Sequence, residues 1–322
     1  MIFVTGGAGF IGSNFVHFIK DKIDEDIVVI DKMTYAADIV NLYPLRFNRN
    51  NTGEEKGNIT HERVDLSDYE EVRRLFKQYK PSAVFHFAAE SHVDNSIKDV
   101  TPFLATNIIG TTNLLRCSVD EPVSVFHHIS TDEVYGALGE FDTPFTEKTA
   151  YDPQNPYSAS KASSDHFVMA YKNTFDLPVK ITNCSNNYGP RQNKEKLIPK
   201  TIDNIINNRK IPVYGLGENI RDWIYVEDHC EAIYEVYKHG QMGEKYNIGG
   251  ECEVKNIDLV HKLIDMLGGS EDLIEYVDDR PGHDLRYAID NAKIASELNW
   301  KPKHTLEQGL EKTIEWYRND RT

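Results

Sequence analysis

The sequence lacks a long apolar run, and it contains few cysteines. No stretch approaches the roughly 20 apolar residues of a membrane helix. The apolar start, Met1 to Thr5, continues into glycines without the basic flank and cleavage site of a signal peptide. The 4 cysteines are scattered and form no Cys-x-x-Cys pair, so the sequence suggests neither a zinc site nor a disulfide framework. We therefore expect a cytoplasmic protein that has no membrane partner and binds no metal.

Basic residues are also scarce relative to acidic ones. The chain has 36 Lys and Arg against 51 Asp and Glu, for a net charge of −15. This balance argues against a nucleic-acid partner or an anionic membrane surface. A small anionic ligand would have to be held by local donors, such as helix N-termini and a few arginines.

What is present is an alternation of short β-rich runs with helical stretches. The 322 residues, 40% of them hydrophobic, can bury a large core. The alternation is typical of an α/β fold with a doubly wound parallel sheet covered on both faces. The predicted strands are Ile2–Thr5, Ile27–Asp31, Ile59–Val64, Ala83–Ala88, Val123–Ser130 and Val179–Asn183, and helices are predicted to begin near Phe10, Tyr69, Phe103 and Tyr157.

A glycine motif directly follows the first predicted strand. Thr5-Gly-Gly-Ala-Gly-Phe-Ile-Gly12 places Gly6, Gly9 and Gly12 between that strand and a helix. Because glycine has no side chain, the backbone at these positions can turn tightly and approach a pyrophosphate at the helix N-terminus. Asp31 ends the next strand, where a carboxylate can accept the adenosine ribose hydroxyls and repel a 2′-phosphate. Glycines alone also fit ordinary turns, but the combination predicts an NAD site of the Rossmann type.

A second motif is the Tyr-x-x-x-Lys pair Tyr157 and Lys161. Helical i,i+4 spacing puts both side chains on one face. A lysine ammonium beside a phenol stabilises the phenolate and lowers a pKa that is ordinarily about 10, so the tyrosine could remove a hydroxyl proton near neutral pH. Alone, the pair would fit a helix surface; the independently predicted nicotinamide site favours a catalytic role.

The third motif, Ser130-Thr131-Asp132-Glu133, follows the buried run Val123 to Ile129. Residues just past a strand's carboxyl end project into the ligand crevice of a doubly wound sheet. Adjacent carboxyl groups can there act as acid and base, provided that their environments push the two pKa values apart. A solvated acidic turn is the usual alternative, and the position between this strand and the Tyr-x-x-x-Lys pair argues against it.

With these motifs the chain resembles the extended short-chain dehydrogenase/reductase family, and within it the dTDP-glucose 4,6-dehydratases, over nearly its whole length. The Thr131 to Glu133 triplet discriminates, because similar 4-epimerases usually carry a serine-rich triplet and similar UDP-glucuronate decarboxylases Thr-Ser-Glu. The matching segments are Thr5–Gly12, Asp31–Tyr35, Ala88–Asp94, Ser130–Gly136, Pro156–Asp165, Asn183–Pro190, Glu195–Pro199, Arg221–Asp228, Tyr246–Gly250 and Asp279–Asp284.

The resemblance implies a lyase that dehydrates dTDP-glucose to dTDP-4-keto-6-deoxyglucose, as in deoxysugar biosynthesis. Tyr157, tuned by Lys161, would deprotonate the 4-hydroxyl while hydride passes from C4 to NAD, and Thr131 would bond the same oxygen. Glu133 would then remove the C5 proton while Asp132 protonates the departing 6-hydroxyl. Hydride returns to C6, so that tightly bound NAD is regenerated each turnover.

The resemblance also implies the binding residues. The cofactor residues would be Gly6, Gly9, Phe10, Ile11, Gly12, Asp31, Lys32, Thr34, Asp65, Leu66, Ala88, Tyr157 and Lys161. The residues for the nucleoside diphosphate hexose would be Glu90, Ser91, Asp94, Asn186, Asn187, Lys196, Leu197, Pro212, Tyr214, Arg221, Asn256, Arg280 and His283. Arg191 and Leu285 differ from frequent family choices beside the nucleotide pocket, so thymine and uracil both stay open as the base.

The fold expected from the resemblance has two regions with the active site between them. The NAD-binding domain would comprise 1–180 and about 215–250, and a smaller, discontinuous substrate domain of loops and small helices would comprise about 181–214 and 251–322. A homodimer would pair through the helices near Phe103 and Tyr157. The open alternatives are a UDP-sugar dehydratase, a 4-epimerase and, from another class, a non-catalytic NAD-binding protein.

Overall fold

The computed structural model describes residues 1–45, 58–279 and 282–319, and its main element is a parallel sheet of seven strands. The spatial order is β10-β6-β5-β4-β1-β2-β3. Each neighbouring pair runs parallel, as in the register of Ile2 with Ile27 and with Ala83. The strands are β1 (Ile2–Thr5), β2 (Ile27–Ile30), β3 (Ile59–Glu62), β4 (Ala83–His86), β5 (Val125–Thr131), β6 (Val179–Cys184) and β10 (Lys245–Ile248). The α/β class and the doubly wound parallel sheet predicted from the sequence are confirmed.

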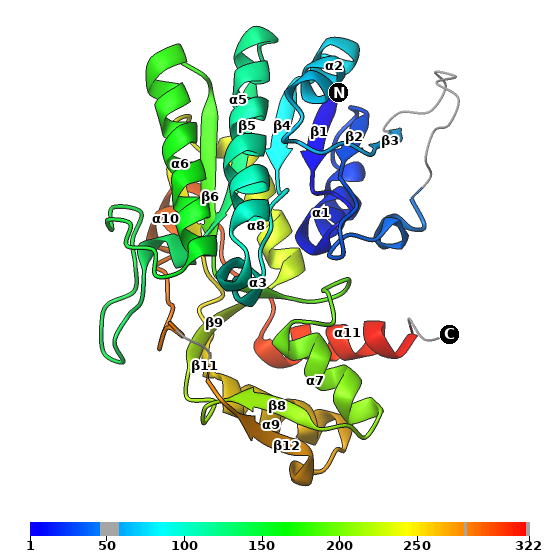
Figure 1. The fold of residues 1–322 in the computed structure, drawn as a ribbon, viewed down its shortest axis with the longest axis vertical. Coiled ribbons are helices and arrows are strands. Elements are labelled where there is room, and N and C mark those ends of the chain that lie inside the picture. Colours follow the sequence, from blue (N-terminus) through cyan, green and yellow to red (C-terminus); the bar gives the residue numbers. More distant parts are fainter. Residues whose placement is uncertain (46–57, 280–281, 320–322) are drawn as a thin grey trace.

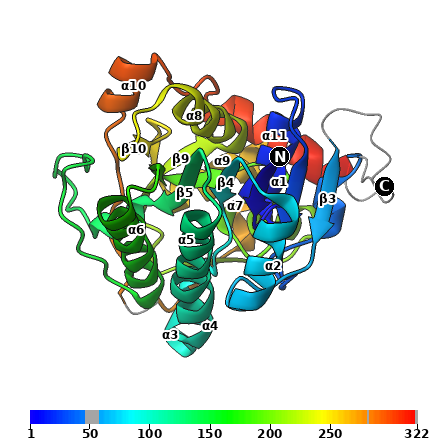
Figure 2. The ribbon, with the colours of Figure 1, turned by 90° about the horizontal axis from the view of Figure 1, so that it is seen from above.

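Helices cover both faces of this sheet, as the view from above shows (Figure 2). One face carries α1 (Phe10–Lys20), α8 (Val226–His239) and α10 (Ala292–Leu298), and the other carries α2 (Tyr69–Tyr79), α5 (Thr111–Asp120) and α6 (Pro156–Phe175). Each layer buries its own apolar cluster against the strands. The near-continuous apolar strands follow from this burial on both sides.

Below the carboxyl ends of the main strands lies a smaller region (Figure 1). It contains a three-stranded sheet in the order β11-β9-β7 and a two-stranded sheet of β12 and β8. Its elements are β7 (Asn186–Tyr188), α7 (Leu197–Ile206), β8 (Ile211–Tyr214), β9 (Ile220–Tyr225), β11 (Glu253–Lys255), α9 (Asn256–Leu267), β12 (Ile274–Val277) and α11 (Leu306–Asn319), with the short helix η4 (Glu271–Leu273).

The helices of this region are longer than the small helices expected from the sequence. Helix α9 spans 12 residues and α11 spans 14. Leu259, Val260, Leu263 and Ile264 form one buried face of α9, which is the i, i+1, i+4, i+5 pattern of a helix packed on a core. Together with buried residues of α7 and α11, this face forms a separate apolar core.

The helix predicted to begin near Phe103 is interrupted. The chain runs through α4 (Thr101–Phe103), a π-helical segment, η2 (Leu104–Gly110), and then α5. In η2 the carbonyl oxygen of Asn107 accepts hydrogen bonds from the Thr111 hydroxyl at 2.6 Å and from the Ser164 hydroxyl of α6 at 2.5 Å. These side chains satisfy a backbone acceptor locally, which accounts for the departure from the α-helical ladder at this point.

Three other short helical elements follow strands of the main sheet. Helices α3 (Val93–Lys98) and η3 (Asp132–Tyr135) follow β4 and β5, and η1 (Ile39–Leu42) follows β2. Asp68 caps α2, because its side chain accepts from the backbone N–H groups of Glu70 and Glu71. In the described ranges, no helix is both long and apolar enough to cross a membrane.

Candidate active site

A cavity of about 670 Å³ lies where the carboxyl ends of the main strands face the smaller region. Every site residue predicted from the sequence lines this cavity, except Arg280, which lies outside the described residues. The glycine motif, the acidic triplet, the Tyr-x-x-x-Lys pair and the residues from the second half of the chain thus converge on one space, as a single binding crevice requires.

At one end of the cavity the glycine motif makes a tight turn between β1 and α1. Gly6 has a φ of +67°, and a Cβ atom there would come within 2.6 Å of the Ala88 nitrogen. A Cβ on Gly12 would come within 2.3 Å of the Gly6 carbonyl oxygen. Helix α1 starts at its N-cap Gly9 with no side-chain capping bond. Its first N–H groups therefore suit an anionic phosphate.

Asp31 follows β2 and is 8% exposed. Its carboxylate accepts from the Ala8 N–H at 3.2 Å and from the Met33 N–H at 2.9 Å, while burial raises its pKa. The next residue, Lys32, donates to the Thr106 hydroxyl at 2.7 Å and lies 3.5 Å from the Glu90 carboxylate. Asp31 is thus fixed by the glycine loop itself, at the place where a ribose would meet a carboxylate.

The acidic triplet begins at the carboxyl end of β5. The Thr131 hydroxyl accepts from the Glu133 N–H at 3.3 Å and donates to the Asp132 carboxyl at 3.2 Å. Burial first, and then the neighbouring carboxylates of Glu133 and Asp222, raise the pKa of Asp132 well above its usual value. Glu133 is less buried and accepts from the Ser158 hydroxyl at 3.1 Å. Asp132 is therefore suited to hold a proton.

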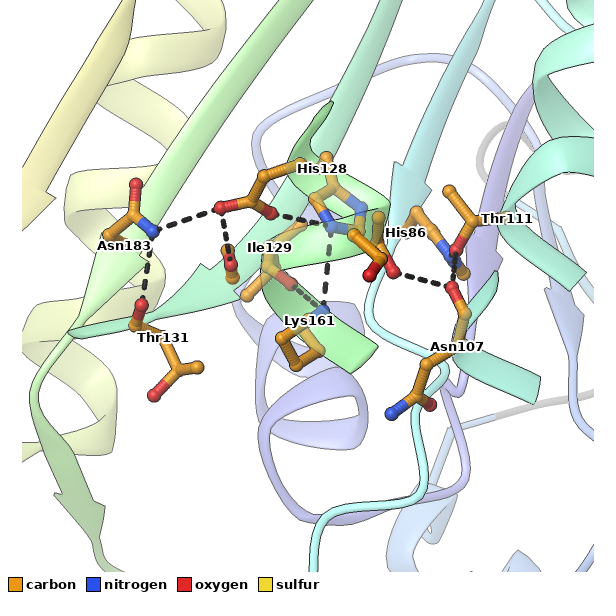
Figure 3. Close-up of polar contacts among 12 residues, drawn as sticks. His86, Asn107, Thr111, His128, Ile129, Thr131, Lys161 and Asn183 are labelled. Atoms are coloured by element: carbon orange, nitrogen blue, oxygen red, sulfur yellow. Dashed lines mark hydrogen bonds and ion pairs between the residues drawn. The ribbon is translucent and has the colours of Figure 1, made fainter. Parts of the chain in front are cut away.

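Helix α6 carries Tyr157 and Lys161, and its start is fixed by Asn155, whose side chain accepts from the Ser158 N–H at 2.9 Å. Both side chains are buried. The Lys161 ammonium donates to the Ile129 carbonyl oxygen at 2.8 Å and lies 3.5 Å from the His128 ring (Figure 3). Burial lowers the pKa of Lys161 to about 8.

The sequence-based expectation of a lowered Tyr157 pKa is wrong for the protein alone. Burial, followed by the Glu133 carboxylate and the Cys184 thiol, raises the pKa of Tyr157 well above 10. The i,i+4 spacing of Tyr157 and Lys161 does not reveal that the phenol is buried. It also does not reveal that the Lys161 ammonium donates its hydrogen bond to the Ile129 carbonyl oxygen.

The far end of the cavity is built by the smaller region. Arg221 is buried, donates to the Asp284 carbonyl oxygen at 3.0 Å and has its guanidinium 4.5 Å from the centroid of the Tyr287 ring. The Lys196 ammonium donates to the Ser91 carbonyl oxygen at 3.3 Å, and the Tyr214 hydroxyl donates to an Asp94 oxygen at 3.3 Å. These contacts link the two regions across the cavity and hold an arginine at its wall.

Several lining residues were not singled out from the sequence, among them Thr106, Trp223 and Tyr287. Trp223 stands within the segment Arg221–Asp228, which matches the family, so that motif could have indicated it. Tyr287 and Thr106 carried no motif of their own. Their places depend on the pairing of 286–289 with distant segments and on the π-helical segment η2.

The residues present fit NAD as the group at this end of the cavity. The glycine cradle would be blocked by a Cβ, the α1 N-terminus is uncapped by any side chain, and a carboxylate stands at the end of β2. This is the donor and acceptor set that a dinucleotide with a free 2′-hydroxyl requires. Within the described ranges, no group of three or more His, Cys, Asp or Glu side chains could hold a metal ion.

Comparison with known proteins agrees with this geometry. The sequence model of the GDP-mannose 4,6 dehydratase family matches residues 3–313. A dTDP-glucose 4,6-dehydratase of Neisseria meningitidis serogroup B is 48% identical over 100% of this chain and 94% of that protein. The chain belongs to the dTDP-glucose 4,6-dehydratase family.

Solved structures place this dehydratase family member among NAD-dependent enzymes of the same fold. A dTDP-glucose 4,6-dehydratase from Streptomyces venezuelae, solved with NAD bound, has a TM-score of 0.93 and 41% identity, covering 99% of this chain and 97% of that one. A UDP-glucose 4-epimerase from Thermotoga maritima has a TM-score of 0.90 at 28% identity, covering 100% and 99%. The fold is thus shared with epimerases, and the site residues must distinguish the reactions.

Proposed function

We propose that this enzyme is a hydro-lyase that dehydrates dTDP-glucose to dTDP-4-keto-6-deoxyglucose with NAD as its tightly bound cofactor. The observation that carries the proposal is the convergence of Asp132, Glu133 and Tyr157 on one cavity together with the glycine cradle. A 4-epimerase needs the tyrosine and the cofactor but no additional acid and base, so the buried Asp132 beside Glu133 favours elimination.

The residues act on the hexose in turn. Tyr157 takes the proton of the 4-hydroxyl while Thr131 hydrogen-bonds the same oxygen. The resulting 4-ketone acidifies the C5 proton, which Glu133 removes as general base. Asp132 gives its proton to the 6-hydroxyl, which leaves as water. NAD, when bound, would accept the hydride of C4 and return it to C6 while protonated Glu133 gives a proton back to C5, and it would bring a positively charged ring into the site.

The positive charge of the nicotinamide ring would favour ionisation of Tyr157. Burial and the Glu133 carboxylate oppose ionisation of its phenol, so the buried tyrosine needs cationic neighbours to act as a base. Lys161, one turn further along α6, is our candidate for one of these cations. We therefore infer that Tyr157 becomes an effective base only in the loaded enzyme.

We assign the nucleoside diphosphate to the smaller region, with Arg221 as the principal cation for the pyrophosphate. Lys196, Asn256 and His283 line the same end of the cavity. The expected division, with 1–180 and about 215–250 for NAD and about 181–214 and 251–322 for the nucleotide sugar, stays a prediction. Strand β9 with Arg221 lies in the smaller region, and α10 packs on the main sheet. Arg280 stays a prediction, as does a cytoplasmic location.

Thymine is the base we propose, because the relatives at 47–48% identity bear the dTDP-glucose name. The test is to incubate the purified enzyme with dTDP-glucose or UDP-glucose, without added NAD, and to follow both by mass spectrometry and proton NMR. We expect dTDP-glucose to lose one water and to gain a C6 methyl signal. Faster loss of water from UDP-glucose would reverse the base assignment, and a product of unchanged mass with inverted C4 would indicate an epimerase.

We further propose a homodimer through the face that α3, η2 and α6 share. Apolar side chains are exposed there, including Ile97, Leu104, Ile109 and Phe167. Leu104 is 44% exposed, whereas Leu114 and Leu115 of α5 are core residues. A cluster of exposed apolar side chains on neighbouring helices favours an association surface.

Substituting Leu104→Glu and Phe167→Glu together tests the dimer. Light scattering after size exclusion should give two chains per particle for the wild type and one for the double variant, because charges on both helices would oppose packing of the two copies. If the double variant still gives two chains per particle, the interface lies on another face.

A further inference from the structure

Beneath the catalytic pair, a carboxylate that the proposed mechanism does not use is buried in the protein. Asp165 lies one turn after Lys161 on α6 and is 1% exposed. One of its oxygens accepts from the Tyr151 hydroxyl at 2.7 Å, the Ser130 hydroxyl at 2.9 Å and the Asn183 amide at 3.3 Å. Three donors on one oxygen are the surroundings of an ionised carboxylate, and the pKa of Asp165 is lowered despite its burial.

The other oxygen of Asp165 faces His128 of β5. The His128 Nε2 atom lies 3.2 Å from Asp165 and 3.5 Å from the Lys161 ammonium. Figure 3 shows Lys161 held between this ring and the Ile129 carbonyl oxygen. Burial lowers the pKa of His128 to about 4, so the ring is neutral near pH 7. Asp165 therefore carries the negative charge of this group. The neutral ring can use Nε2 for a hydrogen bond to Asp165 or to Lys161 but not to both, so the carboxylate acts on the lysine by its charge.

Charged partners near Lys161 decide whether it keeps its proton, because burial alone disfavours the ammonium. Four titratable groups interact electrostatically with it: Asp165 from α6, His128 from β5, His86 from β4 and Cys184 from β6. Both histidines have lowered pKa values and are neutral, and burial raises the pKa of the Cys184 thiol, which is neutral too. Among these four groups, Asp165 supplies the opposing charge.

We propose that Asp165 is a positioning residue for the dehydratase reaction: the charge of its carboxylate keeps Lys161 protonated and its ammonium on the Ile129 carbonyl oxygen, one helical turn from Tyr157. This inference rests on the proposed function for its catalytic consequence, and its structural part stands on the contacts of Asp165 alone. Since the lysine is one turn from Tyr157, loss of its charge removes support for the tyrosine base.

The first test is Asp165→Asn, which keeps the shape and removes the charge. We expect the alkaline limb of the kcat–pH profile to move down by about one pH unit, because Lys161 then loses its proton more readily. KM and the NAD content of the purified protein should stay unchanged. The matched control is Asp176→Asn, the same change at the exposed C-terminal cap of α6, which should keep the wild-type profile. An unshifted alkaline limb in D165N would overturn the proposal.

The closing test needs no substrate, so it separates this inference from the proposed function. Thermal unfolding is measured for D165N, Lys161→Met and the double variant, at one pH and with equal NAD content. If the two charges stabilise each other, Lys161→Met lowers the Tm less when Asp165 is already replaced. The double variant then has a Tm at or above that of D165N.

Additive losses of Tm would contradict the proposal, because the carboxylate would then serve only Ser130, Tyr151 and Asn183. If D165N alone fails to fold, recovery of a folded double variant supports the coupling, and failure of both contradicts it.

Discussion

Asp132 and Glu133 are neighbours in the chain, but their carboxyl groups lie in different surroundings. Asp132 is 2% exposed and accepts a hydrogen bond from the Thr131 hydroxyl. Glu133 is partly exposed and accepts a hydrogen bond from the Ser158 hydroxyl of α6. The pKa of Asp132 is raised well above its usual value by burial and by Glu133 itself. One carboxyl group is thereby suited to give a proton and its neighbour to take one.

Glu133→Gln should stop the elimination while the protein keeps its cofactor. An amide cannot accept the C5 proton, so we expect kcat to fall by about 10²- to 10⁴-fold. Nucleotide binding, measured by calorimetry with dTDP, should stay within about twofold of the wild type because the diphosphate contacts lie at the other end of the cavity. A kcat close to the wild-type value would remove Glu133 from the mechanism.

Asp132→Asn should lower activity and raise stability at alkaline pH. The folded protein holds the Asp132 proton more tightly than the unfolded chain, since its pKa is raised. Asp132 makes its full contribution to stability below the pKa of about 3.9 that it has in the unfolded chain. The contribution is lost as the pH rises through its pKa in the folded protein. We expect the variant to melt a few degrees higher, roughly, than the wild type at pH 8, and the difference to shrink toward pH 4. A lower Tm at pH 8 would contradict the buried, protonated state.

Gly12→Ala should impair both folding and cofactor retention. The new Cβ would lie 2.3 Å from the Gly6 carbonyl oxygen, which is backbone and cannot move aside cheaply. We expect a cost of about 1–3 kcal/mol in unfolding free energy and reduced NAD in the purified protein. Gly139→Ala is the control, because its Cβ would meet only the flexible Asp142 side chain. Equal stability of the two variants would show that the loop can relax.

Asp31→Asn should weaken NAD binding and relax discrimination against NADP. The carboxylate accepts two backbone N–H groups, and an amide can satisfy only one of them as acceptor. We expect about tenfold weaker NAD binding or more, with a smaller loss for NADP because the repulsion of a 2′-phosphate disappears. Fluorescence titration of protein freed of NAD measures both constants, and an unchanged ratio of the two would argue against Asp31 as the ribose acceptor.

Much of the fold could be predicted because its signals are local. The runs around Ile2, Ile27 and Ala83 are short, apolar and followed by turn or helix signals, and each forms a strand of the main sheet. Strand β10 was missed because it is short and joins the sheet only by pairing with the distant strand β6. The π-helical segment at Asn107 depends on the Ser164 hydroxyl of another helix, a contact that no local pattern contains.

Short contiguous motifs were enough to single out four site residues that line one cavity: Thr131, Asp132, Glu133 and Tyr157. What the sequence could not supply was environment. His128 belongs to none of the proposed catalytic or binding residues, yet its ring lies 3.5 Å from the Lys161 ammonium and 3.2 Å from Asp165. Burial, which decides the pKa of Tyr157 and of Lys161, is a property of the assembled core.

The most direct test of the dehydratase assignment uses dTDP-glucose carrying deuterium at C4, incubated with the purified enzyme and no added NAD. If Tyr157, Glu133 and Asp132 act as proposed around a retained cofactor, the product lacks one water and carries the deuterium in its C6 methyl group. A sugar nucleotide of unchanged mass with inverted C4, or one that never loses water even with NAD supplied, would contradict the account.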